Sequence, residues 1–141
     1  MRRLVIVSCG DKKLDRPVAA KDLYVSTLFR LARRYAELAG DEWLIMSSKH
    51  GLVEPDTVLE PYDYTIIGKG KDVKEGFRSS VQVDWAHYIR QHRECLAKPN
   101  TPENLGQYER VVGIEVEAPV GEEYADILRC TGRRGCVKFP L

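Results

Sequence analysis

The feature that most constrains the fold of this 141-residue chain is a short apolar run, RLVIVS, at residues 3–8. A continuous run of aliphatic and β-branched residues is typical of a strand buried on both faces. A segment with apolar residues at helical spacing follows Ser26, and a second apolar run, EWLIMS, occupies residues 42–47. Strand, helix and strand in sequence predict a βαβ unit, whose two strands are parallel and joined by a right-handed crossover.

The rest of the chain continues this alternation of helices and strands. We expect a second helix at about 80–97, a third strand at 110–116, a short helix at 121–129 and a last strand at 135–141. Residues 68–79 are rich in glycine and lysine, which predicts a mobile loop. The sequence therefore predicts an α/β fold, with a single domain over residues 1–141 and a mainly parallel central sheet flanked by helices.

The first helix is predicted in the most detail. Ser26 is a candidate N-cap, and Gly40 stands where the helix should stop. The apolar positions that repeat at helical spacing, and that we expect to face the core, are Leu28, Leu31, Ala32, Tyr35 and Leu38. The charged positions expected on the outer face are Arg30, Arg33, Arg34 and Glu37.

Composition excludes several classes of protein. A formal net charge of +1 argues against a strongly polybasic nucleic-acid binder but allows a local basic patch. No apolar run approaches the ~20 residues that span a bilayer, and no signal peptide follows Met1, so we expect a cytoplasmic protein without a membrane partner. The four cysteines form no CxxC pair and should be reduced, and we predict neither a metal nor another cofactor.

Chemically active side chains follow the strands of the βαβ unit. Because ligands bind beyond the carboxyl ends of parallel strands, residues 8–13, 47–52 and 117–124 should meet at one edge of the sheet. Cys9 is either a nucleophile, favoured as a thiolate by the adjacent lysines, or a small buried residue. Lys13 is a candidate anion contact, and His50 is either a proton-transfer group or a core histidine.

The motifs around these residues resemble an uncharacterised family of small bacterial and phage domains. That family has the pattern C-G-x-x-K-L-D-x-P, then L-Y-x-S-x-L-F, S-x-K-H-G-L and P-Y-D, and the resemblance covers about residues 4–66. It implies that Asp11 and Lys12 occupy variable positions. Two better-known relatives share the outline: the peroxide-stress YaaA family, through Ser8–Asp15, Ser47–Asp56 and Glu60–Tyr62, and the lysine-transferring domain of archaeosine synthase, through Cys9, Lys13 and Gly51–Val53.

These relatives imply contact with DNA in the first case and chemistry on a deazaguanine base of tRNA in the second. Compared with them, we expect no room in this sequence for the helix-hairpin-helix insertion of YaaA, and the sequence ends at Leu141 where the family usually adds a helix.

Topology and resemblance together give the candidate site. The predicted catalytic residues are Cys9, Lys13 and His50. The predicted substrate-binding residues are Ser8, Gly10, Tyr24, Ser26, Ser48, Gly51, Tyr62, Asp63, Gly121 and Tyr124, with a tyrosine stacking on a ring and Gly121 opening a helix that could hold an anion. Asp63 is either an acid/base group or a turn residue.

Three hypotheses for function follow. The first is an enzyme, a transferase or hydrolase that processes a nucleobase, nucleoside or nucleotide at the strand ends. The second is a non-catalytic DNA- or RNA-binding stress-response module that uses Arg30, Arg33, Arg34 and the basic residues of 69–78. The third is a partner-binding protein that keeps the fold without its chemistry. A homo-oligomer is compatible with all three.

Overall fold

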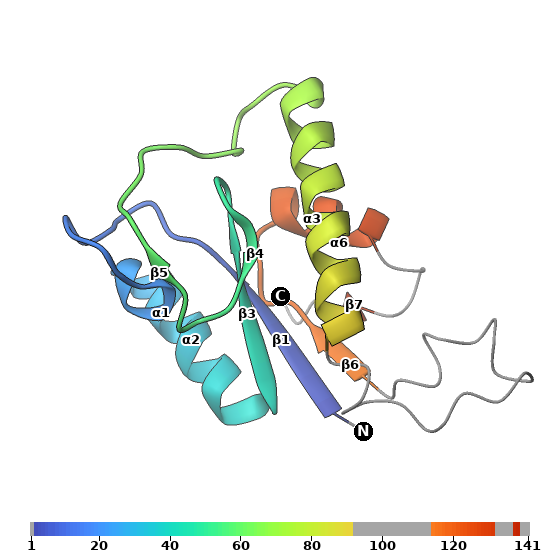
Figure 1. Cartoon of the computed structure of the whole chain (residues 1–141), viewed down its shortest axis with the longest axis horizontal. Coiled ribbons are helices and arrows are strands. Elements are labelled where there is room, and N and C mark those ends of the chain that lie inside the picture. The colour runs from blue at the N-terminus through green and yellow to red at the C-terminus, as the bar shows by residue number, and fades with distance from the viewer. Residues whose placement is uncertain (1, 92–113, 132–136, 139–141) are drawn as a thin grey trace, which may run out of the picture.

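The computed structural model describes residues 2–91, 114–131 and 137–138, which combine helices and strands in one small α/β domain (Figure 1). In chain order the elements are β1 (Arg2–Ser8), β2 (Val18–Ala19), α1 (Ala20–Leu23), α2 (Thr27–Ala39), β3 (Glu42–Ser47), β4 (Gly51–Val53), β5 (Val58–Leu59), α3 (Lys71–Gln91), β6 (Ile114–Glu117), α6 (Glu122–Thr131) and β7 (Val137–Lys138). The predicted α/β class is confirmed.

The strands form two small sheets of mixed direction. The larger sheet has the order β4-β3-β1-β6-β7, in which β1 pairs in parallel with β3 and β6, β6 pairs in parallel with β7, and β4 is antiparallel to β3. The smaller sheet pairs β2 with β5 in antiparallel. The predicted βαβ unit is present as β1, α2 and β3.

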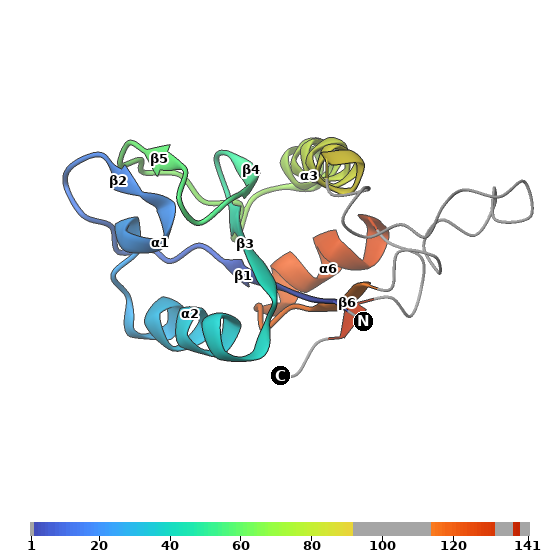
Figure 2. The ribbon, with the colours of Figure 1, turned by 60° about the horizontal axis from the view of Figure 1, so that its bottom comes forward.

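The larger sheet lies between two layers of helices. Figure 2 shows α2 on one side of the strands and α3 and α6 on the other. The alternation of side chains along β1 and β3 supplies both layers, since successive residues of a strand point to opposite faces. Leu4, Ile6, Leu44 and Met46 pack toward α3 and α6, whereas Val5, Val7 and Ile45 pack toward α1 and α2.

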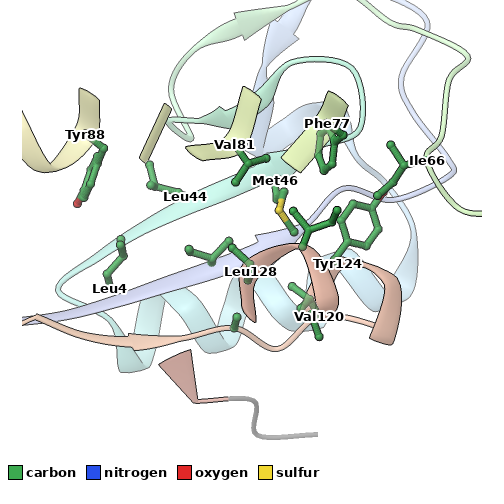
Figure 3. Packing of buried hydrophobic residues seen from close by; sticks show 14 residues of the cluster. Leu4, Leu44, Met46, Ile66, Phe77, Val81, Tyr88, Val120, Tyr124 and Leu128 are labelled. Atoms are coloured by element: carbon green, nitrogen blue, oxygen red, sulfur yellow. The ribbon is translucent and has the colours of Figure 1, made fainter. Parts of the chain in front are cut away.

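We name these two clusters the α3–α6 core and the α1–α2 core. Figure 3 shows the α3–α6 core, where Met46 of the sheet meets Phe77 of α3 and Tyr124 of α6. The rings of Phe77 and Tyr124 are 6.4 Å apart in an edge-to-face arrangement. The α1–α2 core contains Val5, Val7, Ala20, Leu23, Tyr24, Phe29, Ala36, Ile45 and Leu59.

The α2 helix buries a different face from the one predicted. Its N-cap is Ser26, as expected, with the Phe29 N–H donating to Ser26 Oγ at 3.3 Å. Phe29 and Ala36 are its buried residues, however, and the side chains expected in the core, including Leu28 and Leu38, are exposed. The prediction failed because two apolar stripes run along this helix, and the helical period does not indicate which one meets the sheet.

The second helix begins earlier than the sequence predicted. α3 starts at Lys71, so the loop predicted over residues 68–79 is wrong for residues 71–79, which are helical. Phe77 and Val81 lie one turn apart and are buried in the α3–α6 core. This packing outweighs the low helix propensity of Gly76. Residues 92–97 of the predicted helix, and 110–113 of the predicted third strand, lie outside the described residues.

A tight hairpin connects β3 to β4 and requires a glycine. Gly51 has φ +73°, a left-handed conformation that side chains other than glycine adopt at a cost. A Cβ atom there would lie 2.1 Å from Asp84 Oδ2, the oxygen that accepts a hydrogen bond from the Leu52 N–H at 3.1 Å. Gly51 therefore allows the backbone conformation of the hairpin and the close approach of Asp84 from α3.

We expect Gly51→Ala to lower the free energy of unfolding by about 2–3 kcal/mol, combining left-handed strain with loss of the Asp84–Leu52 hydrogen bond. Gly68→Ala is the matched control, because Gly68 has φ +76° but open space around its Cβ position. It should cost about 1–2 kcal/mol from strain alone. Urea denaturation measures both, and equal losses would show that the Asp84 contact is unimportant.

Candidate functional site

Two adjacent serines at the end of β3 organise the candidate site. Ser47 and Ser48 are almost fully buried, with 0% and 3% of their surfaces exposed. Ser47 is the last residue of β3 and Ser48 begins the turn that follows, and their hydroxyl groups bond to tyrosines that pack in different cores. Ser47 Oγ lies 2.7 Å from Tyr62 Oη, and Ser48 Oγ lies 2.5 Å from Tyr124 Oη. One polar cluster therefore forms on each face.

The cluster on the α6 side surrounds the sulfur of Cys9. Cys9 follows β1 and is held there by its own N–H, which donates to the Met46 carbonyl oxygen at 3.0 Å. Its Sγ lies 3.3 Å from Tyr124 Oη and 3.6 Å from Ser48 Oγ. Cys9 is half-buried and packs against both cores.

Backbone N–H groups determine which atoms donate and which accept in the hydrogen bonds of this cluster. The Ser48 N–H donates to Cys9 Sγ at 3.4 Å, and the Ile66 N–H donates to Ser48 Oγ at 3.3 Å. Because a backbone N–H can only donate, Ser48 Oγ must direct its own proton to Tyr124 or Cys9. Burial raises the pKa of Tyr124 above its ordinary value, and a nearby Cys9 thiolate raises it further, so the phenol keeps its proton at neutral pH. The sulfur thus has two donors, the Ser48 N–H and one hydroxyl group of the Ser48–Tyr124 pair.

The cluster on the α2 side is built around Tyr62. Its hydroxyl group lies 2.7 Å from both Ser47 Oγ and Tyr24 Oη, and the His50 N–H donates to Ser47 Oγ at 3.2 Å. Burial is the main cause that raises the pKa of Tyr62 and of Tyr24. Both phenols therefore remain neutral hydrogen-bonding groups at physiological pH.

Charged and aromatic side chains gather on the ring of Tyr62. Lys13 Nζ lies 4.4 Å from the ring centroid, at a distance typical of a cation–π contact. The imidazole of His50 meets the same ring edge-to-face, with centroids 5.4 Å apart. Lys13 has no carboxylate partner within the described residues, so its charge is compensated by ring faces alone.

A cavity of about 750 Å³ opens beside these clusters. Its lining comes from the end of β3, from the segment that crosses the sheet edge between β5 and α3 (Figure 1), and from one face of α3. The lining residues are Ser48, Lys49, Tyr62, Asp63, Tyr64, Asp72, Val73, Gly76, Phe77 and Ser80, and we call this space the α3 cavity. Its volume is within the ~300–1,000 Å³ range of small-molecule sites.

The structure brings together part of the predicted site. Two polar clusters collect Cys9, Lys13, Tyr24, Ser48, His50, Tyr62 and Tyr124, and Asp63 lines the α3 cavity. Of the predicted catalytic residues, none lines that cavity; Ser48 does so and links it to Cys9.

The other predicted substrate-binding residues contribute to the fold and do not line the α3 cavity. Ser26 caps α2, and a Cβ atom at Gly10 would lie 2.6 Å from Ser26 Oγ, so this pair holds the loop against the helix. Gly51 faces Asp84, and Gly121 precedes α6 with open space around its Cβ position. Ser8 ends β1 opposite Met46.

Several residues that the geometry favours are not among the predicted site residues. Ser47 belongs to the segment 47–52 that was predicted to reach this edge, but it was not among the predicted substrate-binding residues, although the adjacent pair Ser47–Ser48 places one hydroxyl group in each polar cluster. The α3 residues of the cavity, such as Asp72 and Phe77, were missed because their segment was interpreted as a loop. Among the described residues, no group of three or more His, Cys, Asp or Glu side chains could hold a metal ion.

We expect the imidazole of His50 to titrate below 6.5, because burial and the charge of Lys49 both lower its pKa. Lys49→Ala should raise that pKa only part of the way, since burial is the larger cause. NMR titration of the His50 ring measures it, with Lys12→Ala as the control. Because the unfolded chain takes up this proton first, His50 makes stability fall as the pH drops from 6.5 toward the folded value. An unchanged pKa in Lys49→Ala would contradict the account.

We also expect Tyr124→Phe to slow iodoacetamide labelling of Cys9 at pH 7 roughly fivefold. The substitution removes one donor to the sulfur and keeps the ring packed on Phe77. Lys13→Ala should also slow labelling, whereas Lys12→Ala should matter less. Peptide mass spectrometry resolves Cys9 from Cys95, which lies outside the described residues. An unchanged labelling rate in Tyr124→Phe would remove the tyrosine from this role.

No helix in the described part of the chain is long and apolar enough to cross a membrane. A comparison with curated proteins matches "Uncharacterized protein YfjM" of Bacillus subtilis (strain 168), which is 42% identical over 72 residues. That alignment covers 46% of this chain and 48% of the relative, so the chain spans about half the length of the curated relative it matches. No solved structure matches the chain.

The predicted resemblance to an uncharacterised bacterial family is confirmed, whereas the more distant kinship with YaaA and archaeosine synthase stays a prediction. A family model described as "Family of unknown function (DUF6884)" matches residues 4–130. Since this match covers most of the sequence, the chain belongs to DUF6884.

Proposed function

We propose that this protein is an enzyme, a transferase or hydrolase, that acts on a nucleobase or nucleoside bound in the α3 cavity. The observation that carries the proposal is the sulfur of Cys9, which accepts from the Ser48 N–H and is joined through Ser48 to an aromatic-lined cavity at the end of parallel strands β1 and β3. Such a position at strand ends is where open α/β sheets bind ligands.

The lining of the α3 cavity supports a planar, polar ligand. Tyr62, Tyr64 and Phe77 offer ring faces or edges, and stacking on a base contributes ~1–3 kcal/mol per contact. Asp63 and Asp72 offer acceptors for ring N–H and amino groups, and Lys49 offers a donor. Apolar walls with a few directed polar groups are typical of a small-molecule site.

The roles of the catalytic candidates follow from their surroundings. Cys9 acts as the nucleophile, since the Ser48 N–H and one hydroxyl group of the Ser48–Tyr124 pair can donate to negative charge on its sulfur. Lys13, without a carboxylate partner in the described part of the chain, neutralises negative charge that develops on the substrate. His50 is neutral near pH 7 because its pKa is lowered, so it can accept a proton there.

The alternative of a non-catalytic nucleic-acid-binding module has less support. Arg33 is bonded to Asp22 and Glu37, and Lys74 is paired with Glu123 at 3.2 Å. Side chains engaged in this way have less charge available for phosphates. Arg30, Arg34 and Lys69 are exposed, but three such residues on a chain of net charge +1 make a weak electrostatic footprint.

The test combines binding and turnover. Standard nucleobases and nucleosides are screened by saturation-transfer NMR, and consumption is followed by liquid chromatography and mass spectrometry. Cys9→Ala should abolish turnover without abolishing binding, and Lys13→Ala should slow turnover roughly 100-fold. Lys12→Ala is the matched control and should behave as the parent protein.

A second pair of variants tests the cavity itself. Ser80 lines the α3 cavity and its neighbour Ser79 does not. Ser80→Leu should therefore weaken binding at least tenfold, while Ser79→Leu should leave it unchanged. Equal affinity in the two variants would show that the ligand binds elsewhere. Binding without consumption would favour the module, and the absence of binding by every compound would overturn the proposal.

A further inference from the structure

Helix α2 carries an apolar stripe that faces away from both cores. Leu28 is 78% exposed, Leu31 61%, Tyr35 39% and Leu38 78%. Isolated exposed apolar residues are ordinary on protein surfaces, but three exposed leucines on one 13-residue helix are not. This stripe is the face that the sequence pattern assigned to the core.

The sheet cannot cover this stripe, because α2 already uses another face to bind the sheet. Phe29 and Ala36, the buried residues, point roughly 120° away from the centre of the stripe on a helix of 3.6 residues per turn. Only Tyr35 reaches back, and its hydroxyl group donates to Glu117 at the end of β6. The three leucines thus have no place in the described fold.

The spacing of the stripe is that of a helix-pairing seam. Its members are separated by three, four and three residues, which is the a/d pattern of two packed helices. The pattern is also symmetric about Arg33. Leu28 and Leu38 each lie five residues from Arg33, and Leu31 and Tyr35 each lie two residues from it. The stripe is therefore complementary to an antiparallel copy of itself.

The two flanks of the stripe differ. Ala32 and Ala39 lie along one side, and small residues there allow two helix backbones to approach closely. On the other side, the symmetry about Arg33 brings the two copies of Arg34 near each other, so their like charges weaken the pairing. Antiparallel helices oppose their dipoles favourably, which offsets part of this repulsion.

The area is near what a reversible dimer needs. The four side chains expose on the order of 400–500 Å², the size of the largest, commonly functional patch on a monomer. Two copies together bury roughly 900 Å² before the flanks are counted, close to the ~1,000 Å² at the lower limit of specific interfaces. We infer that this protein forms a homodimer by isologous, antiparallel pairing of α2 through Leu28, Leu31, Tyr35 and Leu38.

Sedimentation equilibrium of the full chain between 1 and 500 µM tests the inference. The parent protein should dimerise in this range, and Leu31→Glu and Leu38→Glu should each raise the dimer dissociation constant at least 30-fold. Val83→Glu is the matched control, because Val83 is 69% exposed on α3, away from the stripe. Far-UV circular dichroism confirms that the variants fold, as expected for exposed positions.

The orientation is tested by mixing Leu28→Cys with Leu38→Cys under mild oxidation. Peptide mass spectrometry should find the 28–38 disulfide between chains far more often than 28–28 or 38–38. A parent protein that stays monomeric at 500 µM would overturn the inference. So would a dimer that survives both glutamate variants, or one in which 28–28 links predominate.

Discussion

The register between β1 and β3 is the constraint on which the rest of this structure depends. Leu4 pairs with Glu42 and Ser8 with Met46. The even-numbered residues of both strands therefore point to one face of the sheet, and the odd-numbered residues point to the other. Each face of the sheet then presents a continuous apolar surface, and each binds its own layer of helices. Burying one such aliphatic side chain contributes about 1.5–3 kcal/mol, so a shifted register would lose several at once.

The same register decides how the candidate site is divided. Where β3 ends, polar residues follow, and the two serines bond to tyrosine hydroxyl groups that pack in different cores. Buried hydroxyl groups are tolerated because every one of them is hydrogen-bonded, and backbone N–H groups orient both networks. The sulfur of Cys9, between the two cores, is the point where a strand end and both helical layers meet.

Local patterns were sufficient to predict β1 and β3 and the edge where the side chains converge, because β-branched runs and a parallel crossover leave few alternatives, but they did not predict the short strands β2, β4 and β5. Local patterns gave wrong predictions where tertiary contacts determine which residues are buried. The leucines of α2 resemble core residues in sequence, yet Phe29 takes that position. Gly51 resembles a ligand contact, yet a positive φ and Asp84 explain it. The separate faces of Ser47 and Ser48 depend on how far β3 continues, which periodicity alone does not fix.

The two serines also limit how the gene can vary. Inserting or deleting one codon between Glu42 and Ser47 would exchange the faces of the residues that follow, so Tyr62 and Tyr124 would each meet the wrong neighbour. Substitutions in this segment can be accommodated one at a time, whereas a change of length cannot. We therefore expect natural variants of β3 to differ in composition and to agree in the number of residues before the hairpin.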